Sequence, residues 1–162
     1  MQSLTNEQRL AMWLNQTGFS LPSPAEPKGL YRPVVVCNNL AYTSGHLPVD
    51  ASGQMIKGTV GQDLTEEQGR QAAVWAGLGI LSSLRATLGN LNAVRRVIKI
   101  TGLVQSAPGF HGQPAVLNGC SQLFAEVFGP ENGVGVRTAF GTPTLPLGAA
   151  VEIEAIFELG TE

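Results

Sequence analysis

The sequence of 162 residues predicts one layered domain of the α/β or α+β class, with two helices packed on a single sheet. One observation is the order of the expected elements, which is strand, strand, helix, strand, helix, strand, strand. Another is the run 151–158, where apolar and acidic residues alternate, as they do in a sheet covered by helices on one face. The expected covered positions are Val151, Ile153, Ala155 and Phe157, and the expected uncovered positions are Glu152, Glu154, Ile156 and Glu158.

The N-terminal segment predicts a short helix followed by a proline-rich connector. Thr5 or Asn6 can cap this helix, and Gly18 can end it. The segment SLPSPAEPKG at 20–29 contains too many prolines to continue the helix. We expect the helix to be an arm packed on the main body.

A β-hairpin and a long helix come next. The β runs 34–37 and 40–44 are separated by Asn38-Asn39, a pair that tolerates positive φ, so we expect a tight turn there. The helical pattern over 63–90 begins with Thr65 and Gln68, which form a capping box. Its internal glycines cost about 1 kcal/mol each relative to alanine, and close packing on the sheet would compensate for this cost.

The remaining elements alternate between strand and helix. The run 94–105 alternates as a strand, and Pro114 suits the first turn of a second helix. Strands are expected at 135–140 and 149–158. With a short extended piece within 50–58, the sheet would hold about six strands.

Composition limits the partners and the chemistry. Charged residues make up only 14% of the chain, against about a quarter in ordinary domains, and such a surface is often partly hidden in an oligomer. The net charge is −2 and there is no basic stripe, which disfavours nucleic-acid binding. We expect no membrane association and a cytoplasmic location, because the sequence shows neither a signal peptide nor a spanning segment.

Cysteine and histidine are scarce and scattered. Cys37 and Cys120 are far apart, and His46 and His111 form no ligand cluster with them. We expect two free, buried thiols and no metal ion.

Three motifs in order resemble the reactive intermediate deaminase (Rid, YjgF) family, also called the endoribonuclease L-PSP family. They are YTSGHLPVD at 42–50, VLNGCSQLF at 116–124, and VRTAF with LPLGAAVEIEAIF within 136–157. The resemblance covers roughly 29–158. It therefore divides the chain into an arm and connector over 1–28 and a Rid-like domain over 29–162, typical of a longer, less characterised branch.

The resemblance implies an α+β, chorismate-mutase-like fold, with the extra N-terminal helix added to it. It also implies a homotrimer with a cleft between each pair of neighbours. The best-studied members of the family hydrolyse 2-enamines and 2-imines, such as 2-aminoacrylate, to 2-keto acids and ammonia without a cofactor. These intermediates arise from pyridoxal-phosphate enzymes.

Two residues carry the expected chemistry. The resemblance assigns Arg137 to the substrate carboxylate, which a planar guanidinium grips with two parallel hydrogen bonds. It assigns Glu152 to water, which a positioned carboxylate can activate as general base. The structural alternatives are that Arg137 pairs with Glu152 or with a neighbouring subunit, and that Glu152 is an interface residue. We expect an anionic ligand, and not Glu152, to be the main partner of the guanidinium.

Further pocket residues follow from the same motifs. Tyr31 could close the pocket, and Ser44 with Gly45 forms the SG motif, where glycine allows a close approach of the backbone. Asn118 could bind the ligand or, as we favour, make a structural hydrogen bond. Ala139 stands where many members have a cysteine, which places efficiency in question.

Three functions remain open on the sequence. The first is deamination of 2-imino acids, and the second is a non-catalytic trimer that binds a small carboxylate such as a 2-keto acid. Ribonuclease or translation-inhibitor activity is less favoured, because the chain is acidic and has no catalytic histidine pair. Glu152 discriminates between the first two, because only an enzyme needs it to activate water.

Overall fold

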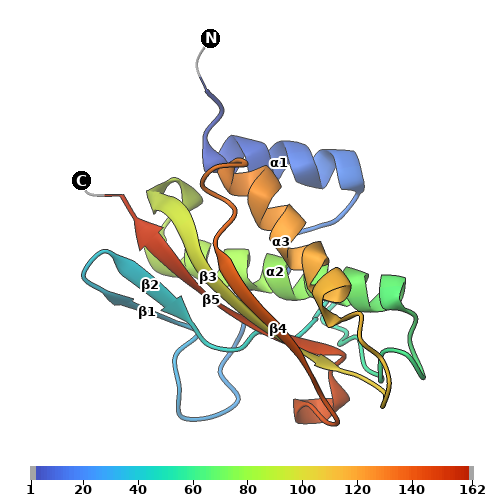
Figure 1. Cartoon of the computed structure of the whole chain (residues 1–162). Helices are drawn as coiled ribbons and strands as arrows, with labels where there is room; N and C mark the ends of the chain where they lie inside the picture. The colour runs from blue at the N-terminus through green and yellow to red at the C-terminus, as the bar shows by residue number, and fades with distance from the viewer. Residues whose placement is uncertain (1–2, 161–162) are drawn as a thin grey trace.

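A computed structural model describes residues 3–160. A mixed sheet in the order β1-β2-β5-β3-β4 carries helices on one face (Figure 1). Its strands are β1 (Val34–Cys37), β2 (Leu40–Thr43), β3 (Val94–Gln105), β4 (Val136–Thr142) and β5 (Val151–Leu159). The helices are α1 (Asn6–Thr17), α2 (Glu66–Leu88) and α3 (Gln113–Phe128), with 3-10 turns η1 (Leu91–Ala93) and η2 (Pro146–Gly148).

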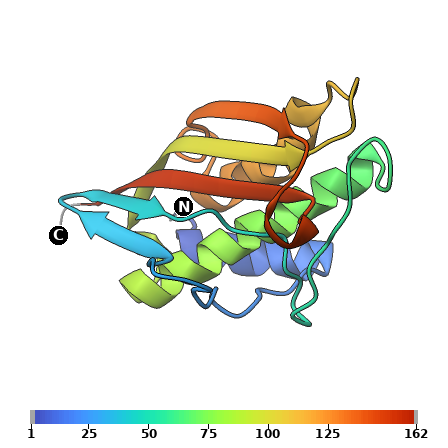
Figure 2. The ribbon, with the colours of Figure 1, turned by 90° about the horizontal axis from the view of Figure 1, so that it is seen from below.

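The sheet is antiparallel except at one edge. β1, β2, β5 and β3 pair antiparallel in that order, whereas β3 and β4 pair parallel. Figure 2 shows the strands side by side. Because parallel neighbours need a crossover connection, α3 links β3 to β4 and lies close to both. The α+β class and the helices on one face are therefore as predicted.

Local signals in the sequence produce the expected turns and caps. Asn38 adopts φ 54° in the hairpin turn. The capping box of Thr65 and Gln68 begins α2, and Thr5 caps α1 with the same arrangement. Gly18 ends α1 in the left-handed conformation.

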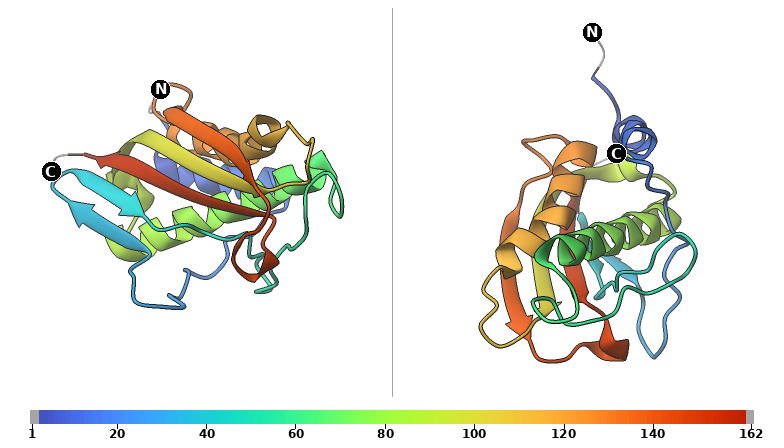
Figure 3. Two further views of the ribbon diagram at one scale, coloured as in Figure 1. Left: turned by 60° about the horizontal axis from the view of Figure 1, so that its bottom comes forward. Right: turned by 90° about the vertical axis from the view of Figure 1, so that its right-hand side faces the viewer.

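The core lies between the sheet and the α2–α3 layer, which Figure 3 shows on one side of the strands. Phe157 of β5 packs against Phe124 and Phe128 of α3, with ring centroids 5.5 and 5.8 Å away. Gly77 lets α2 and α3 approach closely, because an added Cβ would lie 3.0 Å from both Cys120 Sγ and a Leu123 methyl group. At this position the compensation for glycine in the helix is helix–helix packing, and not the sheet packing that we expected.

Two details differ from the expectations. The sheet has five strands and not about six, because the segment 45–60 forms only isolated bridges such as Val49 with Met55. There, the Asp50 carboxylate accepts hydrogen bonds from the backbone N–H groups of Ser52 and Gln54, which closes a tight turn. Cys120 is buried as expected, but Cys37 is exposed, since it ends the edge strand β1.

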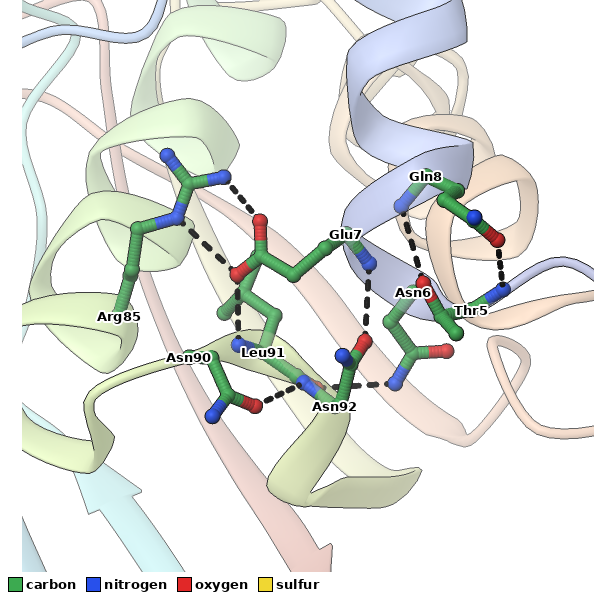
Figure 4. Close-up of polar contacts among 8 residues, drawn as sticks. All are labelled: Thr5, Asn6, Glu7, Gln8, Arg85, Asn90, Leu91 and Asn92. Atoms are coloured by element: carbon green, nitrogen blue, oxygen red, sulfur yellow. Dashed lines mark hydrogen bonds and ion pairs between the residues drawn. The ribbon is translucent and has the colours of Figure 1, made fainter.

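A polar cluster holds α1 against the end of α2 and against η1 (Figure 4). The Glu7 carboxylate accepts hydrogen bonds from the Arg85 guanidinium and, at 2.8 Å, from the Leu91 N–H. Asn6 Nδ2 donates to the carbonyls of Leu91 and Val94, both at 2.9 Å. Burial acts to raise the pKa of Glu7, but the hydrogen bonds from Arg85 and Leu91 outweigh it and leave that pKa below its ordinary value. The arm is thus a docked part of the fold.

Replacing Glu7 with alanine is expected to lower the free energy of unfolding by about 1–3 kcal/mol, because the N–H of buried Leu91 loses its partner. Urea denaturation measures the change, with Glu126→Ala, an exposed position on α3, as control. Equal stability of the two variants would show that the cluster does not anchor the arm.

Within residues 3–160, none of the helices combines the length and apolar character needed to cross a membrane.

Candidate functional site

Arg137 lies on β4 and extends along α3. Its partner in the sheet register is Ile100, a buried residue on the helix-covered face. Arg137 Nη1 donates to Asn118 Oδ1 at 2.8 Å and to Ser121 Oγ at 3.1 Å. Asn118 and Ser121 can both reach it because residues three apart lie on the same side of a helix. Asn118 therefore makes a structural hydrogen bond, and its partner is the arginine side chain itself.

The two hydrogen bonds leave one edge of the guanidinium available. Both use Nη1, and among residues 3–160 neither Nε nor Nη2 of Arg137 has a hydrogen-bond partner. The ion pairs of the described chain involve Arg85, Arg95 and Arg96 instead. The free edge has the fork of N–H groups that binds a carboxylate through two parallel bonds. Arg137 is exposed in the single chain, although its neighbours in the sequence are mostly apolar.

Glu152 lies on β5, on the uncovered face of the sheet. Its register partner on β3 is Leu103. The carboxylate lies directly against Gly45, where an added Cβ would overlap Oε1. The close approach expected at Gly45 is thus made by the Glu152 side chain. Burial raises the pKa of Glu152, and the nearby negative charge of Glu154 raises it further.

Arg137 and Glu152 point to opposite faces of the sheet. Arg137 is in register with Ile100 and Ala155, both buried under the helices. Glu152 is three residues from Ala155 along β5, an odd separation that places it on the other face. Strand β3 also separates β4 from β5. The alternative that the two side chains pair within one chain is therefore wrong.

Tyr31 and Ser44 lie near Gly45, at the edge of the sheet. The Tyr31 side chain is half exposed, and its hydroxyl accepts a hydrogen bond from the Lys28 N–H at 3.3 Å. The Ser44 N–H donates to the Pro33 carbonyl at 2.9 Å, which holds the two chain segments together where they diverge. Tyr31 and Gly45 line one cleft, and Ser44 directly precedes Gly45 in the chain.

Sequence reasoning missed a buried pair formed by His46 and Ser83. His46 Nδ1 lies 2.8 Å from the Ser44 carbonyl, and Nε2 lies 2.8 Å from Ser83 Oγ. A carbonyl only accepts, so we assign the ring proton to Nδ1, and Nε2 accepts from the Ser83 hydroxyl. Burial lowers the pKa of His46, which keeps the ring neutral near pH 7. The two residues are 37 positions apart in the sequence, so no local pattern indicated that they would pair.

A cleft of about 470 Å³ lies beside Tyr31 and Gly45. The connector residues 22–28 form one wall, and residues of the segment 45–55 form the opposite wall. Gly79 of α2 and Leu147 of η2 complete it. This volume is typical of small-molecule sites.

The fold and these residues match a known family. Residues 11–159 match the family described as "YjgF/chorismate_mutase-like, putative endoribonuclease". The chain belongs to this family. The match begins inside α1, ahead of residue 29, where the resemblance was expected to begin.

The chain is similar to one curated protein in sequence and to solved structures in sequence and fold. Protein TCP17 of Trypanosoma cruzi is 40% identical over 151 residues, which cover 93% of this chain and 94% of the relative. The crystal structure of Atu1372 from Agrobacterium tumefaciens, a protein of unknown function, is 40% identical and has a TM-score of 0.85, with 96% of this chain and 94% of that chain covered. RidA from Psychrobacter sp. PAMC 21119 is 25% identical, with a TM-score of 0.59 and coverage of 86% and 96%. The match to RidA therefore covers less of this chain than the match to Atu1372 does.

Ala139, where the resemblance implies a departure from the usual cysteine of the family, lies close to Arg137 in β4. It follows Arg137 by two residues on β4, so both point to the same face of the strand. Its side chain is half buried and packs against the core. A methyl group there leaves the free edge of the guanidinium in place.

Proposed function

We propose that the protein hydrolyses 2-enamine and 2-imine intermediates to 2-keto acids and ammonia, in clefts between neighbouring copies of the chain in a homotrimer. The observation that carries this proposal is the placement of Arg137, with a free carboxylate-binding edge, and Glu152, with a raised pKa, on opposite faces of one sheet. The similarity to RidA supports it.

The need for a second copy follows from this placement. Two groups on opposite faces cannot contact the same small substrate, so Arg137 of one copy must meet Glu152 of another. The uncovered face presents large apolar side chains, including Tyr42, Val136 and Phe140, which are 43%, 67% and 45% exposed. Exposed apolar patches of this kind mark interaction sites. When unlike surfaces of identical copies meet, the copies form a closed ring if the rotation closes.

The chemistry assigned to the composite site is simple. Arg137 binds the substrate carboxylate and thereby fixes C2, the imine carbon, beside Glu152 of the neighbouring copy. Water attacks C2 of the protonated imine, and the Glu152 carboxylate takes up the proton that the water loses. The amino group of the resulting carbinolamine takes this proton. The C–N bond then breaks, and the hydroxyl proton passes to the departing ammonia, which gives ammonium and the 2-keto acid. Oxidation states do not change, so these steps require no redox cofactor.

Glu154 tunes the proposed base. Glu152 must be ionised to accept a proton, so activity falls on the acid side as the pH drops through its pKa, which burial and Glu154 raise above 4.5. Removing the charge in Glu154→Gln lowers this pKa, because the repulsion disappears. We expect the acid limb of kcat/KM to move to lower pH, whereas Glu131→Gln, in the exposed loop before β4, leaves it unchanged. A limb that stays in place in Glu154→Gln would show that Glu154 does not act on the base.

His46 does not support the ribonuclease alternative. Acid–base cleavage of RNA needs imidazoles that reach the substrate, but His46 is 3% exposed and uses both ring nitrogens within the fold. His111 lies apart from it on the exposed loop before α3. We therefore favour the imine substrate, and we expect the protein in the cytoplasm, with the enzymes that generate such imines.

A coupled assay tests the proposal. A pyridoxal-phosphate dehydratase is supplied with serine or threonine, and release of the 2-keto acid is followed with and without the protein. We expect faster release that Arg137→Ala abolishes. If release is not accelerated while 2-keto acids still bind, the protein is a carboxylate-binding trimer and not a deaminase.

A further inference from the structure

The cleft between the connector and the segment 45–55 is mainly apolar. Its two walls contribute Pro22, Pro24, Ala25, Leu47, Val49 and Met55. Charged groups are few: Glu26 and Lys28 are exposed, and Oδ1 of Asp50 accepts hydrogen bonds from Ser52 and Gln54 of its own turn. The cleft therefore favours an apolar group over a second carboxylate.

The cleft adjoins the residues of the proposed site. Tyr31 and Gly45 both line it, and the Glu152 carboxylate lies directly against Gly45. Gly45 therefore borders both the Glu152 carboxylate and this space, and the side chain of a substrate held beside Glu152 would enter the space past Gly45. The methylene group of 2-aminoacrylate would fill only a small part of about 470 Å³.

The connector is a fixed wall, because α2 holds its backbone. Ser82 Oγ donates to the Pro22 carbonyl at 2.6 Å. The Ala25 N–H lies 3.4 Å from Ser83 Oγ, which His46 Nε2 holds from the other side.

Aromatic packing fixes the start of the connector in the same way. The Phe19 ring stacks on Trp13 of α1 at 5.3 Å and meets Trp75 of α2 edge-on at 4.9 Å. The docked arm thus continues directly into the wall of the cleft.

We infer that the connector makes a side-chain subsite, so that the preferred substrates are 2-imino acids with an extended apolar side chain. The inference rests on the proposed function, because it assigns the cleft to the substrate of the same site. It gives the N-terminal arm a role, which is to hold this wall in place.

Binding is measured first, by calorimetry on the assembled full-length protein, with pyruvate and 4-methyl-2-oxopentanoate as product probes. We expect the larger acid to bind at least about tenfold more tightly, because each buried methylene contributes to discrimination. The same order is expected for kcat/KM with the 2-imino acids that an L-amino acid oxidase forms from alanine and leucine.

Filling the cleft from either wall should remove this preference. Ala25→Trp and Ala51→Trp each place a large ring in the cleft, and the matched control Ala11→Trp places the same ring on the exposed side of α1, away from it. We expect the two cleft variants to lose at least about tenfold in affinity for the larger acid and to bind pyruvate as before. Equal affinity for both acids, unchanged in the cleft variants, would overturn the inference.

The binding and activity results separate the two proposals. Selective binding that the cleft variants abolish, without turnover of any imine, would support the subsite and contradict the proposed deaminase. Turnover of both imines at equal kcat/KM, unaffected by the cleft variants, would support the deaminase and contradict the subsite.

Discussion

Replacing Arg137 with alanine is expected to lower kcat/KM for 2-imino acids by about 10²–10⁴-fold, because the substrate loses its bidentate partner and its orientation. Stability should change little, since the side chain is exposed and, among residues 3–160, bonds only to Asn118 and Ser121. Steady-state kinetics and thermal unfolding of the same preparation test both statements.

The matched control for this variant is Arg95→Ala. Arg95 is also an exposed strand arginine, but it pairs with Glu158 at the far end of β5. It should keep wild-type kinetics. Loss of activity in both variants, or in neither, would contradict a specific role for Arg137 in binding the carboxylate.

Replacing Glu152 with glutamine is expected to lower kcat by about 10²–10⁴-fold with little change in KM, because the amide cannot accept a proton from water. Glutamine keeps the shape that packs against Gly45, so the fold should be preserved. Single-turnover kinetics separate the chemical step from binding.

Glu154→Gln is the control for this change, since Glu154 lies two residues along on the same face of β5. It should retain kcat near neutral pH, apart from the shift of the acid limb described above. If Glu152→Gln retained full kcat, the protein would use another group to activate water. If it also lost binding of 2-keto acids, Glu152 would serve the pocket and not the proton transfer.

Much of the fold followed from local signals in the sequence. The Asn38 turn, the capping box of Thr65 with Gln68 and the alternation along β5 depend on residues that are near neighbours in the chain, and all three were predicted correctly. We expected about six strands, but the sheet has five. The segment 45–60 forms isolated bridges and lacks the continuous ladder of a strand.

The site was predictable in its residues but not in its geometry. The alternation along β5 gave the face of Glu152, but β4 carries Val136, Arg137 and Thr138 exposed in succession and has no alternation to reveal which face Arg137 takes. That face is set by the parallel register with β3, a tertiary property. The His46–Ser83 pair and the cleft wall likewise depend on contacts between distant segments, which no periodicity encodes.

The central claim is that each site combines Arg137 of one copy with Glu152 of another. The most direct test mixes Arg137→Ala and Glu152→Gln subunits, each inactive alone, after dissociation and reassembly. In a ring with equal mixing, about one quarter of the clefts would contain both intact residues, so about a quarter of the wild-type activity should return. No recovery from a verified mixed assembly would contradict the account, because it would show that the clefts do not combine Arg137 of one copy with Glu152 of another.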